Sequence, residues 1–319
     1  LDKAPGHDWG TFSRLNQLLK QLKPDVLHSR NLATLELQTV GWWRKVPLRL
    51  HGEHGWDSND IGGSNKKNRL LRHLFKGFVQ RFICLSTESE RYLTTIIGID
   101  NSRVDRICNG VQTDKFSTAS PATLAMPAAV TAAEPVIFAT VGRLASVKNQ
   151  ALLLRSFALL LQQQPEQRQR CALVLVGDGP CRAALEQLTA ELNLQQQVLF
   201  TGNRDDIAQL MQRFSVFVLP SLAEGISNTL LEAMAAGTPV IATQVGGNAD
   251  LMPQELLQRN LVPSNDSSAL MQAMQNYLLQ PELLQSDAEL VKNHCHQHFS
   301  IDTMVSRYRK LYEMTRTQT

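Results

Sequence analysis

Two glutamates eight positions apart, Glu224 and Glu232, are the residues of this chain best suited to chemistry. They follow the apolar run 216–219, which is typical of a buried strand, and Glu232 lies among good helix formers that end at Gly237. We therefore expect a strand, a tight loop holding Glu224, and a helix holding Glu232. Ionised carboxylates accept strong hydrogen bonds from hydroxyl groups, so this pair suits a sugar.

The start of the same helix suits a phosphate. We expect Ser227 or Asn228 to cap it, because both side chains can accept a hydrogen bond from a first-turn amide. The free amides of a helix N-terminus attract anions. The sequence thus places amides that suit a phosphate beside carboxylates that suit a sugar. This combination predicts a nucleotide-sugar ligand.

A second loop, residues 141–149, places two cations after another expected strand. Gly142 allows a sharp turn, and Arg143 and Lys148 supply fixed positive charge that fits a diphosphate. Alone, these two residues are as well explained as surface cations. Together with Glu224 and Glu232 they favour a diphosphate site.

Three weaker signals lie elsewhere. The turn 176–180 is best explained as structural, and the turn with Asn203 and Arg204 is as well explained by turn geometry as by contact with a nucleobase. His51 and His54 flank the end of an expected strand, where a histidine can bind a sugar hydroxyl, although a structural histidine is the commoner case. His28 has no functional interpretation.

Apolar runs alternate with helical patterns along the whole chain. In the first part we expect strands near 25–28, 47–51, 83–86 and 105–108, and helices over 9–22, 31–43, 65–82 and 88–97. In the second part we expect strands near 136–141, 172–176, 198–201, 216–219, 240–243 and 260–262, and helices over 150–163, 181–192, 207–214, 228–236, 267–279 and 301–314. Short buried strands separated by helices predict parallel sheets covered on both faces.

The region 117–134 is rich in Ala, Pro, Thr and Ser and nearly free of charge, so it is expected to be a linker. The predicted organisation is α/β, with two doubly wound domains facing a cleft. Residues 1–116 form a partial first domain, residues 135–299 a nucleotide-sugar-binding second domain, and residues 300–319 a helix that packs back on the first.

Composition and charge exclude several classes of protein. The sequence contains no run of about eighteen apolar residues, so no membrane span is expected. Residues 1–120 carry 18 basic and 12 acidic residues, but the basic residues lack interleaved aromatics, which argues against nucleic acid. The five cysteines have no metal-binding spacing and are expected to be reduced structural thiols of a cytoplasmic protein. The histidines at 294, 296 and 298 are expected on a solvated helix end rather than at a metal.

The motifs resemble the family-four retaining glycosyltransferases, which have the GT-B fold. The resemblance rests on Gly142-Arg143 with Lys148, on Glu224-Gly225 with the run 232–241, and on Val245-Gly246-Gly247. It spans 136–263, and more weakly 24–116 through 24–28, Glu53-His54-Gly55 and Asn109-Gly110-Val111. The run 49–56 is similar to sugar transferases of bacterial exopolysaccharide assembly.

This resemblance implies a role for each matching residue. Arg143 and Lys148 would stabilise the departing diphosphate, Glu232 would bind the ribose, and Glu224 the donor sugar. The donor site it implies comprises Gly142, Arg143, Lys148, Asn203, Arg204, Glu224, Gly225, Ile226, Ser227, Asn228, Thr229 and Glu232. His54 would lie near the anomeric carbon. No metal and no other cofactor is expected, and a UDP-linked hexose would pass to a saccharide or lipid-linked acceptor with retention.

The sequence departs from the family at three places. The opening strand and its Gly-Gly loop have no match and the chain begins at Leu1, so we expect an N-terminally incomplete and inactive fragment. Gln112 replaces a common acid, and residues 248–250 vary a segment that is often Pro-Glu. Neither change removes a charge that the reaction needs.

Acceptor and location are more open. The segment Asn65–Phe82 is expected to be a basic amphipathic helix, with Leu70 and Leu74 on its apolar side and Arg72 on its polar side. It either packs its apolar side on its own sheet or contacts an anionic membrane surface, which would make the protein peripheral on the inner face of the plasma membrane. Two alternatives to a transferase in cell-surface polysaccharide synthesis stay open: a GT-B nucleotide-sugar epimerase, and a nucleotide-sugar-binding fragment without activity.

Overall fold

The computed structural model describes residues 8–54 and 60–314. The chain divides into two compact units. Unit 1 comprises Leu1–Cys108 with Met304–Thr319, and unit 2 comprises Asn109–Thr303. The expected linker 117–134 contains no helix or strand after Ser117, the last residue of α5 (Thr113–Ser117), and donates backbone hydrogen bonds to the carbonyls of Gln209, Gln196 and Gln169 within unit 2.

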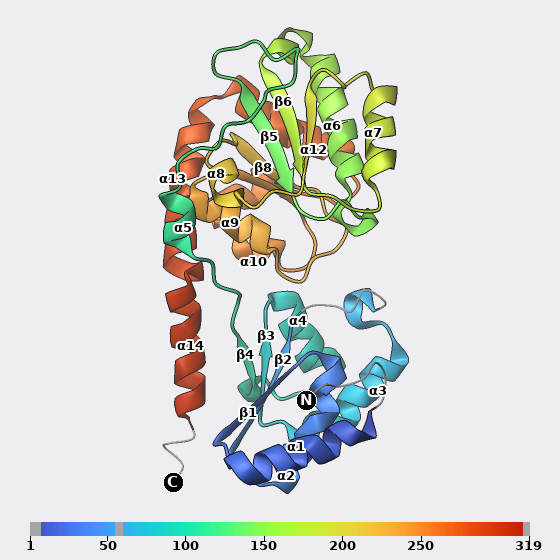
Figure 1. Cartoon of the computed structure of the whole chain (residues 1–319), viewed down its shortest axis with the longest axis vertical. Coiled ribbons are helices and arrows are strands. Elements are labelled where there is room, and N and C mark those ends of the chain that lie inside the picture. The colour runs from blue at the N-terminus through green and yellow to red at the C-terminus, as the bar shows by residue number, and fades with distance from the viewer. Residues whose placement is uncertain (1–7, 55–59, 315–319) are drawn as a thin grey trace. The chain divides into compact units, whose positions relative to one another are not determined.

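Unit 1 is built on four parallel strands in the order β1-β2-β3-β4 (Figure 1). The strands are β1 (Val26–Arg30), β2 (Leu48–Glu53), β3 (Arg81–Cys84) and β4 (Val104–Arg106). The helices are α1 (Trp9–Leu22), η1 (Leu32–Leu37), α2 (Gln38–Trp43), η2 (Ile61–Gly63), α3 (Lys66–Phe75), η3 (Lys76–Phe78), α4 (Thr87–Arg91), η4 (Tyr92–Ile96), η5 (Asn101–Arg103) and α14 (Ile301–Glu313).

The core of unit 1 includes a residue from the far end of the chain. Leu48, Leu50 and Ile83 of β2 and β3 pack with Leu311 of α14, which is 5% exposed. Separate apolar clusters join α1 to α2, and η1 to β3 and the α4–η4 segment. The sheet of unit 1 therefore depends on α14 for part of its core.

Unit 2 has a parallel sheet in the order β10-β9-β8-β5-β6-β7. The strands are β5 (Val136–Val141), β6 (Cys171–Val176), β7 (Val198–Gly202), β8 (Val216–Leu219), β9 (Val240–Thr243) and β10 (Leu261–Val262). The helices are α5 (Thr113–Ser117), η6 (Ser146–Lys148), α6 (Gln150–Gln163), η7 (Pro165–Gln169), α7 (Arg182–Glu191), α8 (Ile207–Met211), α9 (Asn228–Ala236), α10 (Asn248–Leu251), η8 (Gln254–Leu256), α11 (Leu257–Asn260), α12 (Ser267–Leu279) and α13 (Glu282–Phe299).

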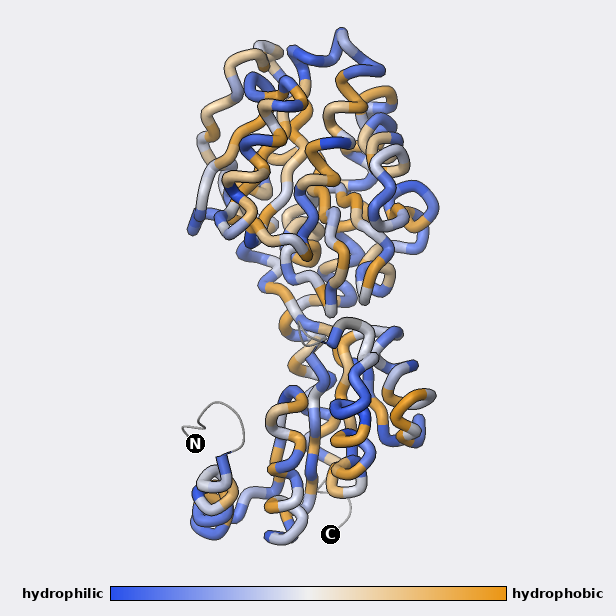
Figure 2. The backbone as a smooth tube through the Cα atoms, turned by 90° about the vertical axis from the view of Figure 1, so that its right-hand side faces the viewer, coloured by the Kyte–Doolittle hydropathy of each residue, from blue (hydrophilic) through white to orange (hydrophobic). Residues whose placement is uncertain are grey.

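Two helical layers cover the sheet of unit 2. Helices α6, α7 and α12 lie on one face, and α8, α9 and α13 lie on the other (Figure 1). Hydrophobic residues run along the strands between these layers (Figure 2). Because β5 pairs with both β6 and β8, the strand order reverses beside β5. Ligands of such sheets bind at this switch point, outside the carboxyl ends of the strands.

The expected fold class is confirmed, because both sheets are parallel and lie among helices. Several helix predictions differ from the structure. The expected helix 65–82 ends at Phe75, and the expected helix 207–214 ends at Met211. The expected helix 31–43 is split into η1 and α2, and the expected helix 88–97 into α4 and η4. Of α13, the sequence predicts only the end near residues 294–298. All five cysteines are free thiols, and burial raises the pKa of Cys171 to about 12. No helix in the described ranges is long and apolar enough to cross a bilayer.

Candidate functional site

The loops after β5 and β8 are neighbours at the carboxyl edge of the unit 2 sheet, because these two strands pair directly. The first loop carries Arg143 and Lys148, and the second carries Glu224. The loop after β9, with Gly246 and Gly247, is next in line. The switch point of the sheet thus brings together the cations and one of the acids expected to form a site.

Lys148 and Glu224 form an ion pair across these two loops. The Lys148 Nζ atom lies 2.6 Å from Glu224 Oε1, and the Ser221 hydroxyl donates to the same oxygen over 2.6 Å. The Glu224 side chain is 9% exposed and that of Lys148 is 29% exposed. The carboxylate is therefore held in place by two donors, one of them charged.

The Glu224 loop rests on the loop after β9. The Gly247 amide donates to the Gly225 carbonyl over 3.0 Å. Gly246 has φ 53°, and a Cβ on it would lie 1.8 Å from the Glu224 carbonyl oxygen. Only glycine allows this approach, so Gly246 fixes the backbone of Glu224. Ile226, next along the loop, is half-buried.

Helix α9 begins as predicted. Ser227 is the N-cap and its hydroxyl accepts from the Leu230 amide, while Gly237 ends the helix with φ 78°. The first-turn amides of Asn228 and Thr229 donate to no acceptor within residues 8–54 and 60–314. They remain available to an anion at the positive end of the helix dipole.

Glu232 lies in the second turn of α9 and is partly buried. Burial raises the pKa of its carboxyl above the ordinary value, and the positive charge of Lys115 on α5 opposes this shift. No described side chain, Lys115 included, donates a hydrogen bond to this carboxylate. An ionised, partly desolvated acceptor without a donor is suited to the hydroxyls of a ligand.

The loop after β5 is braced by the loop after β6. The Gly142 amide donates to the Val176 carbonyl, and a Cβ on Gly177 (φ 127°) would lie 2.1 Å from the Gly142 carbonyl oxygen. The Gln150 side chain donates to the Arg143 carbonyl over 3.1 Å. The Arg143 side chain is exposed and makes no ion pair with any described residue. Its backbone is therefore fixed while its guanidinium is open to an anion.

Asn203 and Arg204 follow β7, which is the edge strand and is separated from β8 by β5 and β6. Asn203 is exposed, whereas Arg204 donates to both carboxylate oxygens of Asp206 over 2.7 and 2.6 Å. Of the two residues considered for contact with a nucleobase, Arg204 is thus already paired with an acid, and Asn203 is paired with none in the described part of the chain.

His54 follows β2 of unit 1. Its ring folds back over the strand, since a Cβ on Gly52 would lie 2.5 Å from His54 Nε2 and 3.4 Å from His28 Nε2. Burial lowers the pKa of His54, and the nearby charge of Arg30 lowers it further. His54 therefore favours the neutral form at neutral pH. The residue is partly exposed, but its Nε2 atom is buried and has no hydrogen-bond partner among the described residues.

His51 points to the other face of the sheet and is fully buried. Its Nδ1 atom lies 2.8 Å from the Ser29 hydroxyl, which accepts from the Gln38 amide group over 2.6 Å. Burial lowers the pKa of His51 to about 4. This environment is that of a core histidine rather than a ligand-binding one.

The prediction that Arg72 lies on the polar, solvated side of the segment Asn65–Phe82 is wrong. This residue is 6% exposed and donates to both carboxylate oxygens of Glu53, over 2.7 and 3.0 Å. Instead, Leu70 and Leu74 are exposed, at 59% and 60%. The helix thus buries a paired charge and presents two leucines to solvent.

Ser221 and Gly246 were not singled out from the sequence as site residues. A third omission is Asn109, whose side chain donates to that of Asn228 over 2.9 Å at the start of α9. Ser221 and Gly246 stand within the motifs already recognised, next to the acidic loop and in the Val-Gly-Gly turn. Their role is visible only once the loops are placed side by side.

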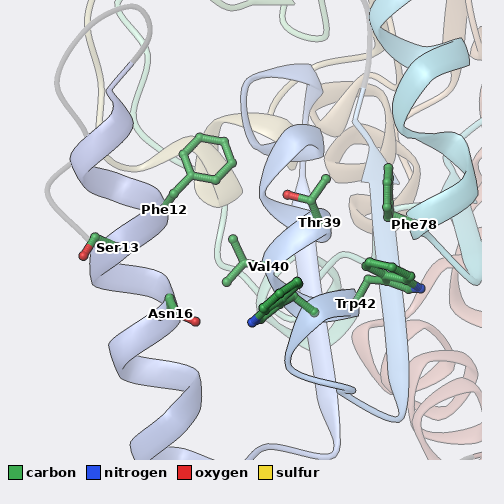
Figure 3. A pocket seen from close by; sticks show the side chains of 8 residues that line it. Phe12, Ser13, Asn16, Thr39, Val40, Trp42 and Phe78 are labelled. Carbon is green, nitrogen blue, oxygen red and sulfur yellow. The ribbon is translucent and has the colours of Figure 1, made fainter.

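Unit 1 also has a surface groove of about 590 Å³ between α1 and α2. Figure 3 shows Phe12 pointing from α1 towards α2, with Trp42 and Phe78 beside each other opposite. The Trp42 and Phe78 rings meet edge to face with centroids 5.5 Å apart.

Within the described residues, no group of three or more His, Cys, Asp or Glu side chains is arranged to hold a metal ion.

Two family models match the chain. The model described as "Glycosyltransferase Family 4" matches residues 1–115, and the model described as "Glycosyl transferases group 1" matches residues 135–280. Together they span most of both units.

Curated relatives include the putative glycosyltransferase EpsF of Bacillus subtilis, 34% identical over 61% of this chain and 51% of EpsF. A second is the UDP-Gal:alpha-D-GlcNAc-diphosphoundecaprenol alpha-1,3-galactosyltransferase of Escherichia coli, 26% identical over 96% of this chain and 79% of that enzyme. The match to EpsF thus spans about half of that relative.

Solved structures share the fold. HepE of Anabaena in complex with UDP has a TM-score of 0.81 at 19% identity, covering 96% of this chain and 82% of HepE. A glycosyltransferase of Rickettsia africae has a TM-score of 0.82 at 19% identity, covering 100% of this chain and 85% of that one.

Proposed function

The chain belongs to the family-four glycosyltransferases with the GT-B fold, and on that premise we propose that it moves a hexose from a nucleotide diphosphate sugar to a saccharide or lipid-linked acceptor with retention of configuration. The observation that carries this proposal is the pairing of Lys148 with Glu224 beside the free amides of α9. We propose a UDP-sugar as donor, because HepE is described in complex with UDP and the Escherichia coli relative is named for UDP-Gal.

Each part of the donor has a matching group in unit 2. Arg143 and the amides of Asn228 and Thr229 bind the diphosphate, Glu232 the ribose hydroxyls, and Glu224 the hydroxyls of the sugar. When the bond from the anomeric carbon to the phosphate oxygen breaks, the leaving diphosphate gains negative charge. Fixed cations and oriented amides stabilise that charge, an effect worth a few kcal/mol at comparable sites.

The acceptor hydroxyl forms its bond to the anomeric carbon on the face that the diphosphate leaves, which retains the configuration. Its proton passes to the leaving phosphate oxygen, so no separate general base is needed. We propose that the partly exposed His54 donates or accepts a hydrogen bond at the sugar, and that the reaction needs no metal ion.

The first test measures thermal stabilisation of the chain by a panel of UDP-glucose, UDP-galactose, UDP-N-acetylglucosamine and GDP-mannose. One donor should raise the midpoint of unfolding, and Arg143→Ala should abolish that rise, whereas Arg155→Ala, an exposed arginine on α6, should not. If no nucleotide sugar stabilises the chain, the donor assignment is wrong.

The second test separates transfer from the alternatives. Nucleotide release is followed with and without an acceptor extract, and in the presence of EDTA. A transferase releases nucleotide only with acceptor, an epimerase converts the donor without acceptor, and a binding fragment does neither. Nuclear magnetic resonance of the product's anomeric proton checks retention, and unchanged rates in EDTA support a reaction without metal.

We further propose that the acceptor is reached at the cytoplasmic membrane surface, in the synthesis of a cell-surface polysaccharide such as an exopolysaccharide. The support is the exposed pair Leu70 and Leu74 on α3, next to Lys66, Lys67 and Arg69. Co-sedimentation with vesicles containing phosphatidylglycerol should exceed that with phosphatidylcholine alone. Replacing both leucines by serine should remove the difference, and equal sedimentation with both vesicles would contradict the proposal.

A further inference from the structure

Ser221 lies between β8 and the acidic loop and is fully buried. Its hydroxyl donates to Glu224 Oε1 over 2.6 Å. A buried hydroxyl this close to a carboxylate makes a strong, charge-assisted hydrogen bond. Such a bond fixes the orientation of the carboxylate as well as its position.

Ser221 is itself anchored to the sheet. The Thr243 hydroxyl donates to the Ser221 carbonyl over 2.6 Å, and the Asn248 side chain donates to the Thr243 carbonyl over 2.9 Å. Thr243 and Asn248 are both fully buried. The hydrogen-bonded chain of Asn248, Thr243 and Ser221 therefore ties the acidic loop to β9 and α10, and the hydroxyl cannot easily move away from Glu224.

The two oxygens of Glu224 have different surroundings. Oε1 accepts from both Ser221 and Lys148, whereas no donor to Oε2 exists within the described ranges 8–54 and 60–314. A carboxylate oxygen has two lone pairs, so Oε1 is saturated by its two partners. Any further donor, including a ligand hydroxyl, must use Oε2.

We propose that Ser221 is a positioning residue for the donor sugar: by saturating Oε1 together with Lys148, it reserves Oε2 of Glu224 as the acceptor for a sugar hydroxyl. This inference rests on the proposed function, because it assumes that Glu224 faces the sugar. Without Ser221, the flexible Lys148 alone holds the carboxylate, which is then free to turn about its last side-chain bond.

The experiment compares the affinities of UDP and of the stabilising UDP-sugar by calorimetry, on the full chain and on Ser221→Ala. UDP lacks the sugar, so its dissociation constant should stay within about twofold. The dissociation constant of the UDP-sugar should rise about tenfold, the usual effect of losing a hydrogen bond to a charged group. The control is Ser156→Ala, which removes another fully buried hydroxyl of unit 2, on α6, and should change neither affinity.

The outcomes separate the inference from the function it rests on. If no UDP-sugar binds the unaltered chain, both proposals fall. If a UDP-sugar binds and Ser221→Ala weakens the binding of UDP and of UDP-sugar equally, or of neither, only the role of Ser221 is overturned. Should Ser221→Ala not fold, Ser221→Cys gives the same comparison, because its thiol is a weak donor of similar size.

Discussion

Gly246 and Glu224 approach so closely that a single methyl group on the glycine would lie 1.8 Å from the glutamate carbonyl oxygen. The two residues belong to loops that follow adjacent strands, β9 and β8. The backbone of the acidic loop thus rests directly on the Val-Gly-Gly turn. The Glu224 side chain is fixed by Ser221 and Lys148, and its main chain is fixed by Gly246.

Gly246→Ala should therefore impair donor use more than overall folding. The new Cβ must displace the Glu224 carbonyl, and the backbone φ of 53° at position 246 is strained for alanine. The clash and the strain together cost on the order of 1–3 kcal/mol. We expect kcat/KM for the donor to fall by about a hundredfold, since small displacements of positioning groups have such effects. Gly77→Ala is the control, because no atom lies within 4 Å of its added Cβ. Equal activity of the two variants would contradict this prediction.

Arg143→Ala and Arg204→Ala should have unequal effects on UDP binding. The Arg143 guanidinium is exposed without an acidic partner, whereas Arg204 is already paired through two hydrogen bonds with Asp206. Losing a charged contact to the diphosphate should raise the dissociation constant of UDP by about 10- to 100-fold for Arg143→Ala. For Arg204→Ala we expect less than about threefold. Isothermal titration with UDP measures both, and the reverse order would move the phosphate site towards β7.

Glu232→Gln should stabilise the ligand-free chain at pH 7 while weakening donor binding. Burial raises the pKa of the folded Glu232 carboxyl above that of the unfolded chain, so the folded state binds more protons in that range. Its contribution to stability is thus present at low pH and is lost as the pH rises through the folded pKa. Glutamine carries no charge, so it removes the free-energy cost of burying an ionised carboxylate at pH 7.

The check on Glu232 uses urea unfolding at pH 4 and pH 7 together with UDP calorimetry. The stability gain of Glu232→Gln should be seen at pH 7 and should shrink at pH 4, and the affinity for UDP should fall about tenfold. Glu289→Gln, at an exposed position of α13, is the control for charge removal alone. A variant that loses stability at pH 7 would show that the carboxylate has a structural partner.

Much of the donor site could be predicted from residue order, because its residues fall at strand ends and strand ends of a parallel sheet meet. Ser227 as N-cap and Gly237 after the helix follow from local propensity in the same way. The partner of Arg204 and the hydroxyl of Ser221 could not be predicted. Which side chains share a hydrogen bond depends on rotamers and loop packing, for which the spacing of residues along the chain gives no signal.

The wrong prediction for Arg72 has a similar cause. Helical periodicity placed it on the polar side of its helix, and it does carry a charge. The structure buries it against Glu53, the acid of the Glu-His pair that ends β2. A buried ion pair needs both partners at one place in the fold, and hydrophobic patterning cannot distinguish such a pair from two solvated charges.

His51 should make the stability of unit 1 depend on pH. Burial lowers its folded pKa to about 4, below the ordinary 6.5, so the unfolded state binds the extra proton between these values. The stabilising contribution is complete above pH 6.5 and is lost as the pH falls from 6.5 towards 4, by about 3 kcal/mol at most. His28 shifts in the same direction, with a pKa of about 4.

Tryptophan fluorescence can measure this effect in the full chain, because all four tryptophans belong to unit 1. Urea unfolding followed at pH 7.5, 6.5 and 5.5 should show a falling midpoint. His51→Asn should be less stable at pH 7.5 but should have a flatter pH profile, whereas the exposed His73→Gln should keep the original profile. An unchanged profile in His51→Asn would assign the titration to another group.

The contribution of α14 to unit 1 affects how this protein is made in the cell. Leu311 completes a core that also contains Leu48, Leu50 and Ile83, more than two hundred residues earlier in translation. Unit 2 is one continuous stretch of chain, so it can fold as soon as it leaves the ribosome. Unit 1 must wait until the segment with Leu311 has been synthesised, and until then part of its apolar sheet face lacks its cover.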